Sequence, residues 1–206
     1  MNIVGVILAA GESSRMGAAK QMLPFKGKTI LQWVIGNAIA SSLQKVIVVL
    51  GHQADLILPL IAGEDVTVIC NTDYKSGQST SIKAGMKALP EGTDSVLFML
   101  GDQPLVTPDT INNILYACQN SENPIVMPVF DGKRGNPVLF RRETFSRLES
   151  LVGDCGARAL FGEYAEKVLQ VQVDDPHILF DLDTKDDYQH LLQMDSSQPE
   201  VITPVR

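Results

Sequence analysis

Short apolar runs alternate along this chain with segments of helical periodicity. Four runs are nearly continuous and rich in β-branched residues: Val4–Leu8, Val46–Leu50, Val66–Cys70 and Val96–Leu100. Such runs are typical of strands that are covered on both faces of a parallel sheet. The pattern therefore predicts a buried, parallel β-sheet.

The segments between these strands have helical spacing. Apolar side chains recur every three or four positions at Leu31, Val34, Ile35, Ala38 and Ile39, and again at Ile82, Met86 and Leu89. Thr107-Pro108-Asp109 predicts a helix start, with a capping hydroxyl, a proline in the first position and an acid in the first turn. Thr184 precedes a similar start. The alternation predicts an α/β fold, a single-domain Rossmann-like three-layer αβα sandwich that binds ligands at the carboxyl ends of its strands.

The middle of the chain departs from this alternation. Ile125–Phe130 and Pro137–Phe140 predict two strands joined by the turn-rich segment 131–136, and therefore an antiparallel insertion at the edge of a mostly parallel sheet. Val168–Val173 predicts a further strand. We expect one domain over residues 1–193, followed by a flexible tail over 194–206.

Composition narrows the function classes. The chain has 206 residues, 45% of them apolar, which is enough for one core that needs neither a metal nor a disulfide to fold. Its 17 basic and 24 acidic residues give a net charge of −7, which disfavours non-specific binding to nucleic acid or to an anionic membrane. We expect no nucleic-acid or membrane partner, and any phosphate chemistry must be local.

The termini and cysteines favour a cytoplasmic location. Met1–Ala10 is apolar but lacks a basic leader and is too short to span a bilayer, so a first strand is the better interpretation. Cys70, Cys118 and Cys155 lie far apart and form no Cys-x-x-Cys pair, which indicates reduced thiols. An adjacent carboxylate disfavours a reactive thiolate at Cys155.

The loop after the first predicted strand combines small residues with two cations. Its sequence is LAAGESSRMGAAK, from Leu8 to Lys20. Small residues allow a ligand to approach the backbone, whose amides can bind phosphate oxygens, and Arg15 and Lys20 add positive charge. The spacing matches neither a P-loop nor the dinucleotide fingerprint. A tight turn without function remains the alternative, and the two cations favour an anion site.

The same loop resembles the signature L-A-A-G-x-S-x-R-M-G-x-x-K of nucleotidyltransferases with a GT-A-like Rossmann fold. Within these, the chain is similar to the molybdenum cofactor cytidylyltransferase branch of the molybdopterin nucleotidyltransferase-like family, over about residues 3–193. The resemblance implies that Leu8, Ala9, Ala10, Gly11, Arg15 and Lys20 bind the nucleoside triphosphate. Guanylyl-transferring relatives have glycine where this chain has Ala10, and the extra methyl group beside the base favours CTP.

Acidic residues follow the fourth predicted strand and precede the last helix. Asp102, in Gly101-Asp102-Gln103-Pro104, lies at a strand end that faces the ligand crevice, where a carboxylate suits Mg²⁺ bound to phosphates. The family has similar G-D-Q-P and D-[IL]-D-T segments, which implies that Asp102 and Asp183 hold Mg²⁺, with Asp181 in support. A turn at Asp102, or complementation of a helix dipole at Asp183, is the structural alternative.

Three further polar residues are candidates for nucleotide binding. Asn71 follows the third strand, and Ser79 and Ser81 lie in a G-x-S-x-S stretch that in the family reads the base and ribose. Helix capping is the alternative role for these hydroxyl groups.

Two segments resemble those that face the acceptor in the family, R-G-[HN]-P and G-D-x-G-A-R. They imply acceptor contacts by Gln103, Arg134, Gly135, Asn136, Pro137, Asp154, Gly156 and Arg158. The glycines also have a plain turn explanation, and Arg158 could instead form a surface ion pair. His52 and His190 are expected to be structural, and the pattern assigns no role to His177.

Taken together, the motifs predict Mg²⁺-dependent nucleotidyl transfer, in which Lys20, Arg15 and Asp102 act on the phosphates. The resemblance implies CTP and molybdopterin as substrates, and a cytosine dinucleotide product for a hydroxylase of the xanthine dehydrogenase type. Another acceptor, such as a sugar phosphate, is the first alternative. A non-catalytic cofactor-binding accessory protein is the second, and the retained lysine and aspartates disfavour it.

Overall fold

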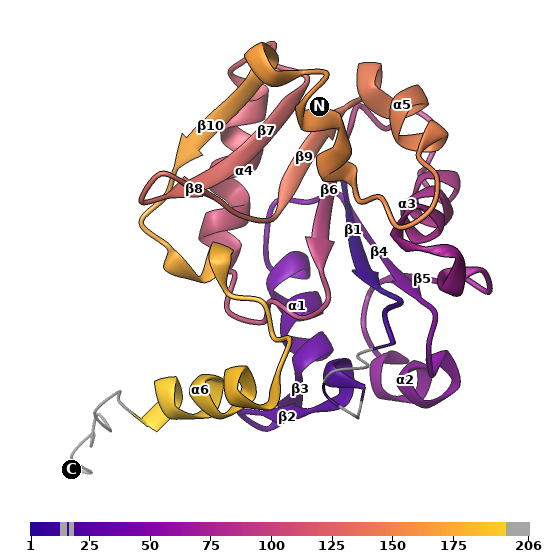
Figure 1. Cartoon of the computed structure of the whole chain (residues 1–206), viewed down its shortest axis with the longest axis vertical. Helices are drawn as coiled ribbons and strands as arrows, with labels where there is room; N and C mark the ends of the chain where they lie inside the picture. Colours follow the sequence, from indigo (N-terminus) through magenta and orange to yellow (C-terminus); the bar gives the residue numbers. More distant parts are fainter. Residues whose placement is uncertain (13–15, 17–18, 197–206) are drawn as a thin grey trace.

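The computed structural model describes residues 1–12, 16 and 19–196 (Figure 1). Its main sheet has the strand order β10-β7-β9-β6-β1-β4-β5, with β8 paired to β7. The strands are β1 (Ile3–Ala9), β4 (Lys45–Leu50), β5 (Thr67–Cys70), β6 (Ser95–Leu100), β7 (Ile125–Phe130), β8 (Lys133–Arg134), β9 (Val138–Arg141) and β10 (Val168–Gln172). Every strand predicted from an apolar run is present.

Parallel pairing brings the functional loops to one edge of the sheet. β1 pairs in parallel with β4 and β6, in a register that places Leu8 opposite Leu100 and Ala9 opposite Leu50. The carboxyl ends of these strands therefore lie side by side, followed by Ala10, Gly51 and Gly101. The predicted crevice at this edge is where the site is found.

The antiparallel insertion lies in the other half of the sheet. β9 is antiparallel to both β6 and β7, and β8 is antiparallel to β7. β9 is thus covered by a neighbour on each side, while β10 forms the edge through parallel pairing with β7. The sheet is mostly parallel, as predicted, and the insertion separates β6 from β7.

Helices cover both faces of the sheet and complete the three predicted layers. On one face, α1 (Ile30–Ile39), α2 (Ala54–Ile61) and α4 (Pro108–Gln119) share a buried cluster with the strands. On the other, α3 (Gln78–Lys87) and α5 (Phe145–Ser150) contribute to a second cluster. Both helix starts are capped as predicted, because Thr107 accepts from the Thr110 amide and Thr184 from the Asp187 amide, each at 3.2 Å.

A smaller apolar cluster joins residues 25–30 to residues 182–191. Phe25, in the hairpin formed by β2 (Pro24–Phe25) and β3 (Lys28–Thr29), packs with Ile30, Leu182 and Leu191. Leu191 belongs to α6 (Lys185–Ser196), which lies beside this hairpin in Figure 1. α6 includes residues 194–196, which the sequence assigns to the tail, and 197–206 lie outside the described residues. The cluster holds the segment before α6 against the segment before β2.

Candidate active site

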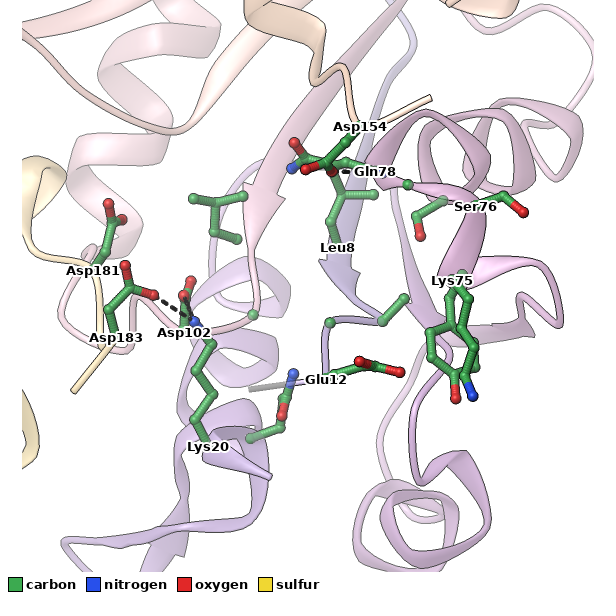
Figure 2. A pocket seen from close by; sticks show the side chains of 18 residues that line it. Leu8, Glu12, Lys20, Lys75, Ser76, Gln78, Asp102, Asp154, Asp181 and Asp183 are labelled. Carbon is green, nitrogen blue, oxygen red and sulfur yellow. Dashed lines mark hydrogen bonds and ion pairs between the residues drawn. The ribbon is translucent and has the colours of Figure 1, made fainter. Parts of the chain in front are cut away.

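A cleft with a volume of about 830 Å³ lies at the carboxyl edge of the sheet. Figure 2 shows its side chains. They come from the loops after β1 and β6, from the start of α3 and from the segment before α6. Most of the lining residues are polar or charged, namely Glu12, Lys20, Gln21, Tyr74, Lys75, Ser76, Gln78, Ser81, Asp102, Asp154, Asp181 and Asp183.

Lys20 links two carboxylates from distant parts of the chain. Its ammonium group donates to Asp102 in a short hydrogen bond and to Oδ1 of Asp183 over 3.1 Å (Figure 2). Asp102 lies two residues after the end of β6, and Asp183 lies two residues before the start of α6. The two acids predicted as a pair therefore share one cation at the edge of the cleft.

The charges in this cluster are coupled. Partial burial alone would lower the pKa of Lys20, but the negative charges and hydrogen bonds of Asp102 and Asp183 outweigh it and raise that pKa. Nearby, partial desolvation and the charge of Asp102 raise the pKa of Asp181. The site therefore carries more negative charge than Lys20 alone neutralises, an environment that favours an additional cation.

Gln103 connects the carboxylate cluster to the next loop. Its buried amide donates to Oδ1 of Asp181 over 2.8 Å and to the backbone oxygen of Ile178 over 3.3 Å. Gln103 thus holds Asp181 in place from inside the protein. Gln103 does not line the cleft itself, and it influences the cleft through its hydrogen bond to Asp181.

The loop after β1 supplies a small-residue wall. Leu8, Ala10 and Gly11 line the cleft, whereas Ala9 belongs to the buried core on one face of the sheet. This follows from the alternation of side chains along a strand. The expected contact of the Ala9 side chain with the nucleotide is therefore not supported. Arg15 lies outside the described residues.

Of the three polar residues predicted to bind the nucleotide near the start of α3, one lines the cleft and two do not. Ser81 lines the cleft, but the Ser79 hydroxyl is buried and donates to the backbone oxygen of Gly153 over 2.7 Å. Asn71 does not line the cleft, since its amide donates to the hydroxyls of Thr80 and Ser81 over 2.8 and 3.0 Å. Asn71 and Ser79 thus hold the framework beside the cleft.

Several residues of the cleft were not predicted from the sequence. Tyr74, Lys75, Ser76 and Gln78 form its wall opposite Lys20, and Glu12 lies on the loop after β1 (Figure 2). The signal was Gly77, which precedes α3 with a φ of 106°. Glycine readily adopts positive φ, so a glycine between a strand and a helix indicates a tight loop. The residues beside such a loop can line a ligand site.

A second pocket, of about 240 Å³, adjoins the cleft. The two share Leu8, Gln78, Leu100 and Asp181, and the second pocket is completed by Phe98, Asn136, Val138, Phe140, Gly156, Ala157, Arg158, Ala159 and Phe161. Three of the predicted acceptor residues, Asn136, Gly156 and Arg158, line this pocket, and Asp154 lines the cleft. These four residues thus border two adjoining cavities.

The remaining predicted acceptor residues do not line either cavity. Arg134 is exposed on β8, where it pairs with Val129. Gly135 and Pro137 are buried, and Gly135 packs so closely on Ile178 that a Cβ atom would lie 2.6 Å from the Ile178 oxygen. Gly135 and Pro137 therefore position Asn136, and a direct acceptor contact by Arg134 is not supported.

The donor set fits a hard divalent cation that also binds phosphate. Asp102 and Asp183 offer carboxylate oxygens at one point, where the Lys20 ammonium group offsets only part of their charge. Within the described part of the chain, no cluster of three or more histidine, cysteine or acidic side chains has the arrangement of a metal centre. Such an ion would therefore take further ligands from phosphates and water, as Mg²⁺ commonly does.

The histidine and cysteine positions are not part of the cleft. Nδ1 of His177 lies 2.8 Å from Asp175, which caps the 3₁₀ helix Pro176–Leu179. Cys70, Cys118 and Cys155 are free thiols, as predicted. The side chains that line the cleft therefore offer carboxylates, the ammonium groups of Lys20 and Lys75, amides and hydroxyls.

An α/β fold with a cation and paired carboxylates at the carboxyl edge of its sheet defines a class of proteins that bind and transform phosphorylated ligands. The model of the MobA-like NTP transferase domain matches residues 5–168. The chain belongs to this family of nucleotidyltransferases. Within the described residues, no helix is both long and apolar enough to cross a membrane.

Individual relatives span nearly the whole chain. The molybdenum cofactor cytidylyltransferase of Escherichia coli (strain K12) is 31% identical over 186 residues, which are 89% of this chain and 92% of that protein. The purine catabolism protein PucB of Bacillus subtilis (strain 168) is 32% identical over 198 residues, covering 90% and 94%. The crystal structure of Rv0371c of Mycobacterium tuberculosis H37Rv, complexed with manganese, has a TM-score of 0.81 at 29% identity, covering 94% and 99%.

Proposed function

We propose that this protein transfers CMP from CTP to molybdopterin or its molybdenum form and releases pyrophosphate. The observation that carries the proposal is the junction of Lys20, Asp102 and Asp183 at the edge of a cleft of about 830 Å³. A cation and two carboxylates converge there from three separate segments. The likeness to the cytidylyltransferase of Escherichia coli supports the choice of substrates.

In this proposal Asp102 and Asp183 hold Mg²⁺ when the nucleotide is bound. The ion would neutralise phosphate charge and draw electron density from the α-phosphorus. A divalent ion is also found in the manganese complex of Rv0371c. Asp102, Asp181 and Asp183 line the cleft beside Lys20, so a divalent cation would offset their repulsion of a bound triphosphate.

The residues of the chain supply position and charge. Lys20 and Arg15 contact the triphosphate and stabilise the charge that accumulates on pyrophosphate as it leaves. Gly11 lets the phosphates approach the backbone, and Ser81 contacts the nucleoside from the start of α3. Leu8 and Ala10 border the base, where the methyl group of Ala10 favours a pyrimidine over a purine.

The reaction itself requires little proton transfer. A terminal phosphate oxygen of the acceptor attacks the α-phosphorus of CTP in line, the α–β phosphoanhydride bond breaks, and pyrophosphate leaves with that electron pair. The acceptor phosphate is already ionised near neutral pH, so the rate depends on alignment and charge stabilisation. The product would serve a hydroxylase of the xanthine dehydrogenase type.

Pyrophosphate release tests the proposal. The protein is incubated with Mg²⁺ and each of CTP, GTP, ATP and UTP, with and without molybdopterin. We expect release that requires both molybdopterin and CTP. Release without any acceptor, equal release with a hexose 1-phosphate, or no release with any nucleotide would refute the assignment.

A further inference from the structure

The cleft contains a second lysine, on the wall opposite Lys20. Lys75 lies in the 3₁₀ turn Tyr74–Ser76, lines the cleft and is exposed (Figure 2). Within the part of the chain that the structure describes, Lys20 and Lys75 are the only basic residues that line the cleft, beside five acidic ones. A ligand with several negative charges therefore depends on few cations here.

The two lysines differ in what they bind within the protein. The ammonium group of Lys20 is shared by Asp102 and Asp183. Among the described residues, Lys75 has neither a hydrogen bond nor an ion pair from its side chain, and its Nζ lies 5.9 Å from the centre of the Tyr74 ring. Because an ammonium group has three donors and no acceptor, Lys75 can offer all of them to an anion.

The turn that carries Lys75 is held in place on both sides. The Ser76 amide donates to the backbone oxygen of Asp73 over 2.8 Å. The hydroxyl of Tyr74 lies 3.4 Å from Nδ1 of His52, two residues after β4. A turn fixed in this way limits the positions that the ammonium group of Lys75 can reach, so less freedom is lost when a ligand binds.

The same turn adjoins the loop after β1. A Cβ atom at Gly51 would lie 2.8 Å from the Cβ atoms of both Ala10 and Tyr74, so these two side chains flank one glycine. Ala10 precedes Gly11, which in the proposed function lets the phosphates approach the backbone. Lys75 is therefore carried by a turn that packs beside the phosphate-binding loop.

We propose that Lys75 binds the terminal phosphates of the nucleotide from the wall opposite Lys20. Lys75 attracts the triphosphate and holds its β- and γ-phosphates, whereas Lys20 stays with the carboxylate pair. Because this contact is made equally before and during transfer, it lowers KM for the nucleotide and leaves kcat unchanged. The choice of CTP as the nucleotide rests on the proposed function.

A series of ligands tests the proposal without catalysis. Isothermal titration calorimetry is performed on the full chain with Mg²⁺ and without an acceptor, using CTP, pyrophosphate and CMP. In Lys75→Met we expect CTP and pyrophosphate to bind about tenfold more weakly, as for the loss of one hydrogen bond to a charged group. CMP, which lacks these phosphates, should bind as it does to the parent protein.

The ligand series also defines failure. Pyrophosphate has no nucleoside, so a loss of its binding cannot come from the base or ribose. Unchanged binding of CTP and pyrophosphate in Lys75→Met would overturn the proposal. An equal loss for CMP and CTP would move the contact to the nucleoside and overturn it as well.

Two further variants separate a direct contact from a structural effect. Lys75→Arg keeps a cation that donates to phosphate, so it should restore part of the CTP affinity. An arginine variant as weak as Lys75→Met would refute the contact. Lys87→Met, at the exposed end of α3 and outside the cleft, is the matched control and should bind CTP like the parent protein.

Steady-state kinetics gives an independent readout. In Lys75→Met, KM for CTP should rise about tenfold while kcat stays within about twofold, the pattern of a contact made equally in the ground and transition states. A fall in kcat with an unchanged KM would contradict the proposal.

The outcome is separable from that of the proposed function. Pyrophosphate binding that depends on Lys75, in a protein that transfers no CMP to molybdopterin, would retain the contact and refute the assigned reaction. Transfer of CMP to molybdopterin with the same KM for CTP in Lys75→Met would retain the reaction and refute the contact.

Discussion

The cleft and the second pocket adjoin one another but differ in the side chains that form their walls. The cleft gathers Lys20, Asp102 and Asp183 through ion pairs and leaves them accessible to a ligand. The second pocket also has polar lining residues, but one wall of it is formed by the rings of Phe98, Phe140 and Phe161. Charge alignment can lower a reaction barrier, whereas a fixed apolar shape selects what binds. We therefore expect changes in the cleft to affect turnover and changes in the pocket to affect substrate choice.

The largest effect is expected for Asp102→Asn. The substitution keeps the size of the side chain but removes its charge, so cation binding and the ion pair to Lys20 both weaken. Turnover should fall by about 10²–10³, as for other groups that stabilise charge in a transition state. Pyrophosphate release measures it, and the exposed Asp109→Asn serves as the control. Near-normal turnover in a folded variant would remove Asp102 from the machinery.

Lys20→Met tests the ammonium group separately. Turnover should fall by roughly 10², because the leaving pyrophosphate loses a positive partner. Without nucleotide, Mn²⁺ should bind more tightly than to the parent protein, since no ammonium group competes for Asp102 and Asp183. Electron paramagnetic resonance of free Mn²⁺ measures this, and weaker Mn²⁺ binding would contradict the competition.

Gly77→Ala tests the packing of the segment before α3 against Gly153. Gly77 has a φ of 106°, and a Cβ atom there would lie 2.4 Å from the backbone of Gly153. We expect the free energy of unfolding to drop by about 2 kcal/mol, because backbone strain and a steric clash add. Chemical denaturation measures the loss. Gly63→Ala, where a Cβ atom meets nothing within 4 Å, should be close to neutral, and equal losses in both variants would refute the clash.

Ala10→Gly tests whether the Ala10 methyl group selects between the bases of CTP and GTP. Removing the methyl group should relax the preference for CTP over GTP by about tenfold, at the low end for one methyl group in a pocket. The ratio of kcat/KM values for the two nucleotides measures it. If the ratio stays the same, the size argument fails, whatever happens to absolute turnover.

The smallest effect is expected at Asp187, which holds Asp183 in position. Its carboxylate accepts from the backbone amides of Asp183 and Thr184 over 3.1 and 2.7 Å. Hydrogen bonds from Thr184, from its side chain first, lower the pKa of Asp187 below its usual value of 3.8. Asp187→Ala should reduce the free energy of unfolding by about 1 kcal/mol at pH 7.

The pH dependence has a definite sign. Because the folded-state pKa is lowered, the contribution of Asp187 is complete above the unfolded-state pKa and disappears as the pH falls through the folded-state pKa. The difference between the parent and Asp187→Ala should therefore shrink below pH 3.8. Denaturation at neutral and acidic pH measures it, with the exposed Asp186→Ala as a control. A difference that grows on acidification would contradict this assignment.

The local pattern was sufficient for the strands and for part of the cleft. Apolar runs predicted each strand of the α/β alternation because burial on both faces leaves little choice of residue. Leu8, Ala10, Gly11 and Asp102 reach the cleft because they lie at or beyond the ends of parallel strands, which share one edge. The alternation of side chains along β1 also explains why Ala9 does not.

Two of the predicted site residues have side chains that are bonded within the protein. Asn71 and Ser79 have side chains suited to a ligand, but other parts of the protein use them first. Ser79 bonds to Gly153, which is 74 positions away, and no short-range signal shows that partner. A polar side chain near a predicted site can instead form hydrogen bonds within the protein, and only the tertiary structure shows whether it does.

The sequence by itself determined the parallel sheet, the positions of its turns and therefore the edge at which ligands bind. The tertiary structure decided that Lys20 meets Asp183 across 163 positions and that Asn136 shares a pocket with Phe98, Phe140 and Phe161. The physical reason is that strands follow from local burial patterns, whereas these contacts depend on the apolar cluster that docks α6 on the β2–β3 hairpin and on the close packing of Gly135 against Ile178.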